Sequence, residues 1–276
     1  MKIVISGLGI IGGSFAKALK KYTDHYIIGI NRSPAPLEAA LSSGAIDEAG
    51  SENSLSEADI LILGTFPDAS IEFIKKNAGL IPKHCIVIDS AGIKTDICRE
   101  ISAVAKEYGF EFVGVHPMAG KEKNGFAAAE ADLFCGASCI IIPGDASQGA
   151  VDKITALAQK IGFGRIVYST PGEHDRMIAF TSQLPHVIAC SYVMSPVCKK
   201  HPGFSAGSYR DVSRVAHINE KLWTELFIEN KEPLIQELDI LMENLSSIKS
   251  AVEKGDRSEL EALLAKSRMI KEELGE

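Results

Sequence analysis

Runs of apolar residues alternate with segments of helical periodicity over the first 170 residues. Between the runs, apolar residues recur at three- and four-residue spacing, which is typical of amphipathic helices. Strands separated by helices form parallel sheets with helices on both faces. The pattern therefore predicts an α/β domain with a doubly wound parallel sheet. The expected strands cover 2–6, 26–30, 60–64, 86–89, 111–115, 138–143 and 165–168, and the expected helices cover 14–22, 36–43, 68–78, 95–108 and 147–161.

The pattern changes at about residue 171, where long helical periodicity begins and no further strand is predicted. Helices are expected at 173–197, 222–254 and 258–273. A chain of 276 residues is long enough for two domains. We therefore expect an N-terminal domain over residues 1–170 and an all-α C-terminal domain over 171–276. Long amphipathic helices can bury their apolar faces against a second subunit, so the second domain is expected to form a homodimer.

Three glycines join the first strand to the first helix in a G-x-G-x-x-G arrangement, Gly7, Gly9 and Gly12. The first permits a tight turn, the second lets a pyrophosphate approach the backbone, and the third allows close packing of helix on strand. Ile10 and Ile11 open the helix, whose N-terminus offers N–H donors to an anion. The context predicts a Rossmann-like dinucleotide-binding domain; the alternative is a purely structural glycine turn.

The end of the second strand reads Asn31-Arg32-Ser33. An acidic residue at this point usually binds the ribose hydroxyls of NAD, whereas a basic one accommodates the 2′-phosphate of NADP. Here the acidic residue is missing and Arg32 stands beside its place. Arg32 could equally be a solvated surface residue. This feature leans towards NADP or a relaxed choice, so the cofactor stays open: we expect NAD, with NADP possible. Thr65, at the end of the third predicted strand, is a further candidate contact.

His116 follows the strand predicted at 111–115, and Pro117 is expected to end that strand. Ligands of open α/β sheets collect outside the carboxyl ends of the strands, and an imidazole suits acid/base chemistry near neutral pH. His116 is therefore the first candidate for catalysis; the alternative is a loop histidine that caps the strand. Ser90 and Lys94 follow the neighbouring strand. Lys94 is expected either to neutralise an anionic ligand or to be a solvated lysine of the first helical turn.

Two stretches interrupt the helical pattern of the second domain. Pro185 lies inside a predicted helix, where proline costs roughly 3 kcal/mol unless a kink accommodates it, and His186 follows it. Arg210 and Arg214 lie in a segment rich in glycine and serine. A guanidinium can bind a carboxylate through two parallel hydrogen bonds. The alternative for these arginines is a salt bridge to Asp211 or to a neighbouring glutamate, and His186 could equally lie on a solvated face.

Charge and cysteine content narrow the class of protein. The net charge of −7 and the absence of a basic stripe argue against nucleic-acid binding, and an anionic substrate would need local cations. No apolar run reaches the roughly 18 residues of a membrane span. The six cysteines form no C-x-x-C pair, so we expect free thiols, a cytoplasmic location and no metal site.

Taken together, the motifs resemble the prephenate dehydrogenase family. The resemblance covers nearly the whole chain in the same order. It rests on Gly7-x-Gly9-x-x-Gly12, His116-Pro-Met-Ala-Gly120, Glu122-Lys-Asn-Gly125, Glu173-His-Asp175, Leu184-Pro-His186, Tyr209-Arg-Asp-Val-Ser-Arg214 and Trp223.

This resemblance implies oxidation of prephenate, a dicarboxylate, to 4-hydroxyphenylpyruvate and carbon dioxide with hydride transfer to NAD(P), a step of tyrosine biosynthesis. It implies that His116 takes the proton of the ring hydroxyl and that Arg214 binds a substrate carboxylate. His186 and Arg210 are then expected to line the substrate pocket, and Glu122 is expected to support or gate it.

One position departs from the family pattern. Members often have a serine two residues before the lysine after the strand at 86–89, where this chain has Gly92. Ser90 or a water would have to supply that hydroxyl. Arogenate dehydrogenase is the nearest alternative, and no residue separates it from prephenate dehydrogenase. A β-hydroxyacid dehydrogenase or a non-catalytic dinucleotide sensor fits the motifs less well.

Overall fold

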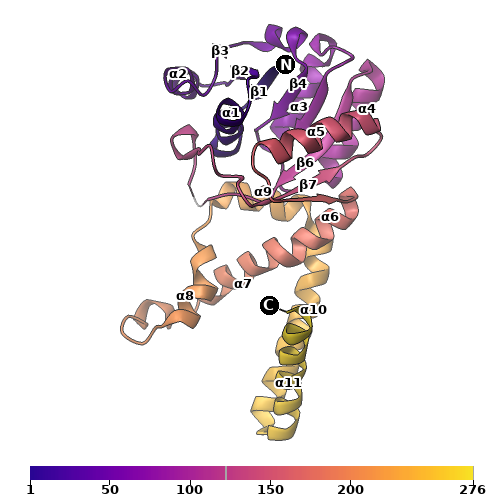
Figure 1. The fold of residues 1–276 in the computed structure, drawn as a ribbon. Helices are drawn as coiled ribbons and strands as arrows, with labels where there is room; N and C mark the ends of the chain where they lie inside the picture. The colour runs from indigo at the N-terminus through magenta and orange to yellow at the C-terminus, as the bar shows by residue number, and fades with distance from the viewer. Residues whose placement is uncertain (122, 276) are drawn as a thin grey trace.

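The computed structural model describes residues 1–121 and 123–275. Its N-terminal part is a sheet of eight strands in the order β3-β2-β1-β4-β5-β6-β7-β8 (Figure 1). The order reverses between β1 and β4, which is where open α/β sheets place their ligand crevice. The strands are β1 (Lys2–Ser6), β2 (Tyr26–Ile30), β3 (Glu48–Ala49), β4 (Ile60–Leu63), β5 (Ile86–Asp89), β6 (Glu111–Pro117), β7 (Ser138–Ile142) and β8 (Arg165–Tyr168).

Helices cover both faces of this sheet. Successive side chains of a strand point to opposite faces, so Ile3 and Ile5 of β1 join one apolar core while Val4 joins the other. The first core includes residues of α1 and α5, and the second includes residues of α3 and α4. The expected doubly wound α/β fold is confirmed. The helices of this domain are α1 (Ile10–Tyr22), α2 (Pro34–Ser42), α3 (Pro67–Asn77), α4 (Thr95–Tyr108) and α5 (Gln148–Lys160).

The sheet differs from the prediction around His116. Strand β6 continues through His116 and Pro117 and pairs antiparallel with β7, so the sheet is not parallel throughout and Pro117 does not stop the strand early. The pairing with β5 extends only to Val113, and β7 takes up the residues beyond it, with His116 opposite Ile140. Proline is tolerated here because β6 has no described partner on its β5 side beyond Val113, so this end of the strand resembles a sheet edge. His116 is consequently held in a paired strand and not in a loop.

The C-terminal part is helical. Its helices are α6 (Pro171–Ile178), α7 (Leu184–Val193), α8 (Gly207–Ser213), α9 (Glu220–Glu229), α10 (Lys231–Lys254) and α11 (Arg257–Leu274). Short turns of 3-10 helix occur at Glu52–Glu57, Ala78–Leu80, Phe126–Ala128, Cys198–Lys200 and Arg214–Ala216.

Two helices that were predicted as continuous are interrupted. A π-helical turn, η4 (Ala179–Gln183), separates α6 from α7 and ends two residues before Pro185. Proline cannot donate the usual backbone hydrogen bond, and a π-helical turn changes the bonding register at that point. The second predicted helix breaks at Asn230, between α9 and α10. Both breaks place polar side chains in the interior of the helical domain.

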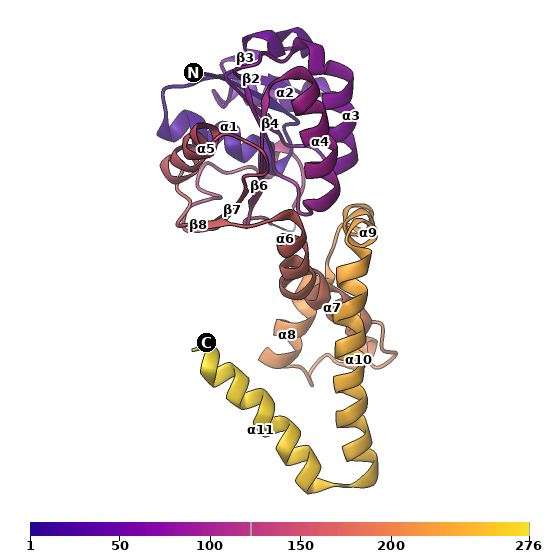
Figure 2. The ribbon, with the colours of Figure 1, turned by 90° about the vertical axis from the view of Figure 1, so that its right-hand side faces the viewer.

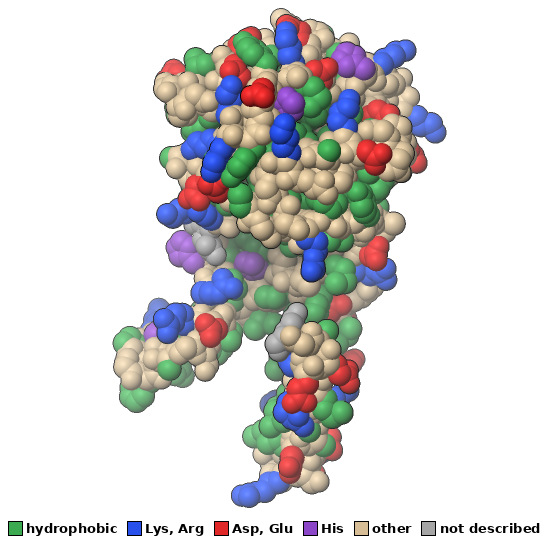
Figure 3. All heavy atoms as spheres, viewed as in Figure 1, with side chains coloured by type: hydrophobic (Ala, Val, Ile, Leu, Met, Phe, Trp, Pro, Cys, Tyr) green, Lys and Arg blue, Asp and Glu red, His purple; other side chains and the backbone are tan. Residues whose placement is uncertain are grey.

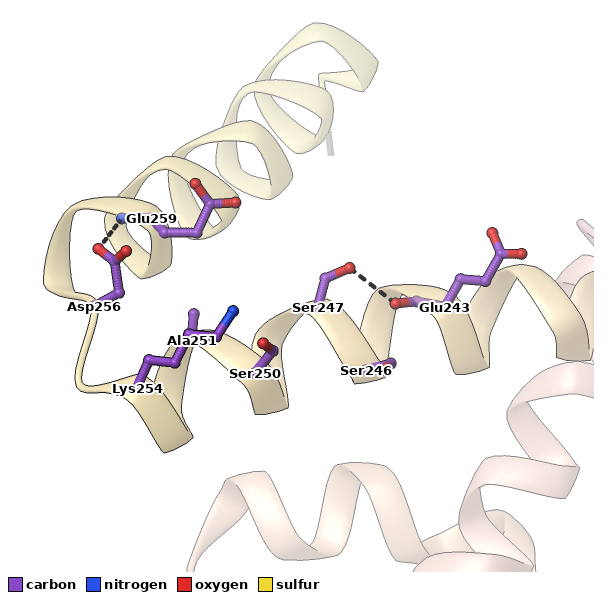
Figure 4. A pocket seen from close by; sticks show the side chains of 8 residues that line it. All are labelled: Glu243, Ser246, Ser247, Ser250, Ala251, Lys254, Asp256 and Glu259. Carbon is purple, nitrogen blue, oxygen red and sulfur yellow. Dashed lines mark hydrogen bonds between the residues drawn. The ribbon is translucent and has the colours of Figure 1, made fainter.

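Helix α10 runs away from the sheet domain and α11 returns at an angle to it (Figure 2). Both helices expose large apolar side chains, among them Ile235, Met242, Leu245, Leu264 and Leu274. Apolar surface is visible along these two helices in Figure 3. A pocket of about 620 Å³ between α10 and α11 is lined largely by serines and charged residues and contains none of the predicted site residues (Figure 4). None of the described helices combines the length and the apolar content that spanning a bilayer requires.

Candidate active site

The glycine loop after β1 is as tightly packed as its sequence predicts. Gly7 has a φ of +94°, in the left-handed region that favours glycine. A Cβ atom at position 12 would lie 1.9 Å from the Gly7 carbonyl oxygen, so no other residue fits there. No described side chain caps α1, and its first turn carries no acidic residue. The N–H groups of Ile10 and Ile11 therefore open a helix N-terminus suited to a phosphate group.

The other predicted cofactor residues gather at the same edge of the sheet. Asn31 accepts a hydrogen bond from Leu8 N at 3.0 Å and donates one to Ser33 O at 2.9 Å, so it fastens the glycine loop to the end of β2. Arg32 and Ser33 are exposed there. At the end of β4, the Thr65 hydroxyl lies 2.7 Å from Ser70 Oγ, and a Cβ at position 7 would lie 2.5 Å from the Thr65 methyl carbon.

His116 belongs to a chain of three hydrogen-bonded side chains. Its Nδ1 atom lies 2.8 Å from Nε2 of His174, whose Nδ1 atom lies 2.7 Å from Oδ1 of Asp175. Both His174 and Asp175 are 2% exposed. An ionised carboxylate only accepts hydrogen bonds, so His174 donates to Asp175 through Nδ1 and accepts from His116 through Nε2. This assignment leaves a lone pair on Nε2 of His116, which is what a general base needs.

The pKa shifts of these hydrogen-bonded side chains support the assignment of His116 as a general base. Burial alone would raise the pKa of Asp175, but hydrogen bonds from His174, Thr95 and Lys94 outweigh it and lower that pKa. The carboxylate accepts from the backbone N–H groups of Lys94 and Thr95, each at 2.8 Å, where α4 begins. Burial, the charge of Lys94 and the neighbouring His174 lower the pKa of His116 well below its usual value. His116 is therefore neutral, and Asp175 ionised, at neutral pH.

The prediction for Lys94 has to be corrected. Its side chain is 0% exposed, and its ammonium group is paired with the equally buried carboxylate of Asp89. Lys94 is thus neither a solvated lysine nor placed to contact a substrate carboxylate, because its donor group is already bound beneath the surface. Asp89 in turn accepts a hydrogen bond from Val115 N at 3.0 Å. The Lys94–Asp89 pair is therefore hydrogen-bonded to the residue that precedes His116 in β6.

The structure also separates Ser90 from His116. The Ser90 hydroxyl donates to Leu63 O at 2.9 Å and so binds the end of β4; among the described residues it forms no hydrogen bond to His116. Position 92 does lie beside the imidazole, because a Cβ atom there would lie 4.0 Å from Nε2 of His116 and 3.6 Å from a methyl carbon of Leu226. The expected substitution of Ser90 for the missing serine is therefore not supported by the geometry.

Three further predicted site residues, His186, Arg210 and Arg214, lie in the helical domain. The half-buried ring of His186 stacks on Trp223 with ring centres 3.7 Å apart, and its Nδ1 donates to Ser182 O at 2.7 Å. Arg210 lies on α8 and Arg214 at its end, and both are exposed. Neither takes part in an ion pair with another described residue, so the alternative of a salt bridge to Asp211 is not observed. Glu122 lies outside the described residues.

Sequence reasoning assigned no role to His174 and Asp175, although they were part of a quoted motif. The available signal was the run Glu173-His-Asp175, three successive titratable residues near the start of a helix. The sequence pattern gave no sign of a role for Asn230. This residue is 2% exposed, and its side-chain amide donates to Asp175 O at 2.9 Å and to Gln183 Oε1 at 2.8 Å. These bonds tie α6, the π-helical turn and the break between α9 and α10 together.

Comparisons with known proteins agree with this architecture. Residues 15–168 match the family model for the prephenate dehydrogenase nucleotide-binding domain, and residues 170–266 match that for the prephenate dehydrogenase dimerization domain. The chain is 30% identical to prephenate dehydrogenase of Bacillus subtilis over 94% of this chain and 72% of the relative.

Two solved structures are also similar. Arogenate dehydrogenase of Synechocystis is 27% identical, with a TM-score of 0.84 and coverage of 99% of this chain and 100% of the other. Prephenate dehydrogenase of A. aeolicus, solved with hydroxyphenyl propionate and NAD+, has the same fold, with a TM-score of 0.86, 24% identity and coverage of 99% and 98%. With both family models matched in order along it, the chain belongs to the prephenate dehydrogenase family.

Proposed function

We propose that this protein oxidises prephenate to 4-hydroxyphenylpyruvate and carbon dioxide, with NAD as hydride acceptor, and so serves tyrosine biosynthesis. The observation that carries the proposal is the hydrogen-bonded arrangement of His116, His174 and Asp175, which leaves a lone pair on Nε2 of His116 at the strand ends where the glycine loop also lies. A base beside a dinucleotide site suits removal of a hydroxyl proton together with hydride transfer.

The reaction balances with this one base. His116 takes the proton of the ring hydroxyl as a hydride leaves the same carbon for the nicotinamide. The bond from the ring to its carboxylate then breaks, carbon dioxide leaves, and the electron pair makes the ring aromatic. The resulting phenolate oxygen takes the proton back from His116. The enzyme has to position the ring and exchange one proton, which is orientation combined with acid/base catalysis.

Arg214, Arg210 and His186 are proposed to bind the substrate. Both guanidinium groups are exposed and unpaired among the described residues, and a dianion needs such cations in a chain of net charge −7. The stack of His186 on Trp223 gives a flat wall in the same domain, which suits a six-membered ring.

Arogenate remains the second candidate substrate, because one of the similar structures is an arogenate dehydrogenase and the two substrates differ only by an amino group in place of a keto oxygen. Initial rates of nicotinamide reduction with prephenate and with arogenate, each with NAD and NADP, test the proposal. We expect prephenate with NAD to give the highest kcat/KM. No reduction with either substrate would refute the function. Measurable NADP use would support Arg32 as a 2′-phosphate contact.

We propose further that the chain acts as a cytoplasmic homodimer. The exposed apolar side chains of α10 and α11, such as Ile235 and Leu264, form the kind of face that subunits bury. All six cysteines are free, as is usual in a reducing compartment. Light scattering during gel filtration should give twice the chain mass of 29.6 kDa. A monomer at micromolar concentration would contradict the dimer.

A further inference from the structure

The ion pair between Lys94 and Asp89 lies in the core of the sheet domain. Both side chains are 0% exposed. Removing two charges from water carries a large cost, and well-packed apolar residues often replace such pairs with no loss of stability. Fold stability alone is therefore a weak reason for this pair, and its surroundings suggest another.

Hydrogen bonds connect the pair to His116 by two routes. On one side, Asp89 accepts from Val115 N at 3.0 Å, directly before His116 in β6. On the other side, the backbone N–H of Lys94 donates to Asp175, and Asp175 connects through His174 to His116. The two routes close a ring that passes through β5, the start of α4, α6 and β6. The imidazole is thus fixed both at its backbone and at its Nδ1 atom.

We propose that Lys94 is a positioning residue for His116: its pair with Asp89 holds the imidazole in place, and its ammonium group disfavours a second positive charge there. Lys94 acts through its neighbours and not on the substrate. The inference rests on the proposed function for its catalytic meaning, because only a base needs to stay unprotonated.

The sign of the electrostatic effect follows from the groups around the imidazole. The described titratable groups of this network are Lys94 at the start of α4, Asp89 on β5, and His174 and Asp175 on α6. A nearby ammonium disfavours a second positive charge on the imidazole, and burial, Lys94 and His174 together lower the pKa of His116. Removing the charge of Lys94 should therefore raise that pKa and shift the acidic limb of the kcat/KM profile to higher pH.

The test is a titration of the histidine rings by NMR in the full-length protein labelled on histidine, with the His116 signal assigned by its loss in His116→Asn. In Lys94→Gln we expect the His116 midpoint to rise by about one pH unit or more, and the acidic limb of kcat/KM to move with it. Lys75→Gln is the matched control, because Lys75 forms an exposed ion pair with Glu100 in the same domain. It should leave the midpoint and the limb unchanged.

If Lys94→Gln does not fold, the paired variant Lys94→Met/Asp89→Asn removes both buried charges; the His116 midpoint should then rise by a smaller amount, because the carboxylate that favours a protonated imidazole is lost as well. A folded variant whose His116 midpoint stays at the wild-type value overturns the proposal. The titration needs no substrate, so it separates two failures. A shifted midpoint in a protein that oxidises neither prephenate nor arogenate would refute the proposed function and leave the positioning role intact.

Discussion

The Nε2 atom of His174 lies 2.8 Å from the Nδ1 atom of His116, with the two rings inclined at 63°. The two histidines are 58 positions apart and belong to different domains. The contact fixes which nitrogen of His116 carries the proton, as the orienting partner of a catalytic histidine does in hydrolytic triads.

We expect His116→Asn to lower kcat by roughly a hundredfold or more, because the general base is lost. The dissociation constant of NAD should stay unchanged, since the glycine loop does not depend on this side chain. Stopped-flow measurement of hydride transfer checks the loss in rate, and fluorescence titration with NADH checks that cofactor binding is unchanged. An unchanged kcat would show that His116 is not the general base.

His174→Phe should keep the ring volume and remove the hydrogen-bond acceptor that orients His116. We expect kcat to fall by about ten- to a hundredfold, as for losses of groups that orient a catalytic residue. The sharp control is a double-variant cycle. In the His116→Asn background the same substitution should have almost no further effect, because residues that act as a unit are not additive. Additive losses would show that His174 acts independently.

Arg214→Ala should raise KM for prephenate by an order of magnitude or more, which corresponds to at least about 1.4 kcal/mol. The effect on kcat should be smaller, and NAD affinity should not change. Arg214→Lys should restore binding only in part, because an ammonium cannot form the two parallel hydrogen bonds of a guanidinium. A variant with wild-type KM and a lower Tm would indicate that Arg214 has a structural role. Arg210 would then be the candidate for binding the substrate carboxylate.

Gly92→Ser and Gly92→Ala form a matched pair beside the base. A Cβ at position 92 meets its neighbours at ordinary contact distance, the nearest being 3.6 Å away, so both variants should fold. Only the serine adds a hydroxyl near Nε2 of His116. We expect kcat/KM of the serine variant to exceed that of the alanine variant about three- to tenfold, the value of one hydrogen bond. Equal values would mean that no hydroxyl is needed there.

Glu229 provides a test of stability against pH. Burial, followed by the charges of Glu225 and Asp68, raises its pKa to about 7. In the unfolded chain a glutamate titrates near pH 4.3. The folded state thus holds a proton that the unfolded state has lost, and the free energy of unfolding falls as pH rises through this window.

Glu229→Gln removes that titration. Its Tm relative to wild type should therefore increase between about pH 5 and pH 8, by about 2 to 4 °C. Glu232→Gln, at an exposed position of α10, is the control and should show no such trend. A difference in Tm that stays constant across the pH range would contradict the assignment.

The local pattern predicted the strands and helices of the sheet domain well, because β-branched runs and glycine turns are properties of neighbouring residues. It failed where a distant partner decides the structure. His116 and Pro117 lie within a strand only because β7 pairs with them. Lys94 was expected to neutralise an anion or to be solvated, and its sequence neighbours do not reveal that the anion it pairs with is the buried carboxylate of Asp89. Asn230 joins Asp175 and Gln183 across about 50 residues, which no periodicity records.

The chain of hydrogen bonds through His174 crosses the junction of the two domains near Pro171. Asp175 accepts from Lys94 and Thr95 on the sheet domain, while its own helix belongs to the other domain. A hinge motion at this junction would pull Asp175 away from α4 and leave His116 without its orienting partner. We therefore expect the two domains to move as one body during turnover, so that His116 keeps its orienting partner from substrate binding to product release.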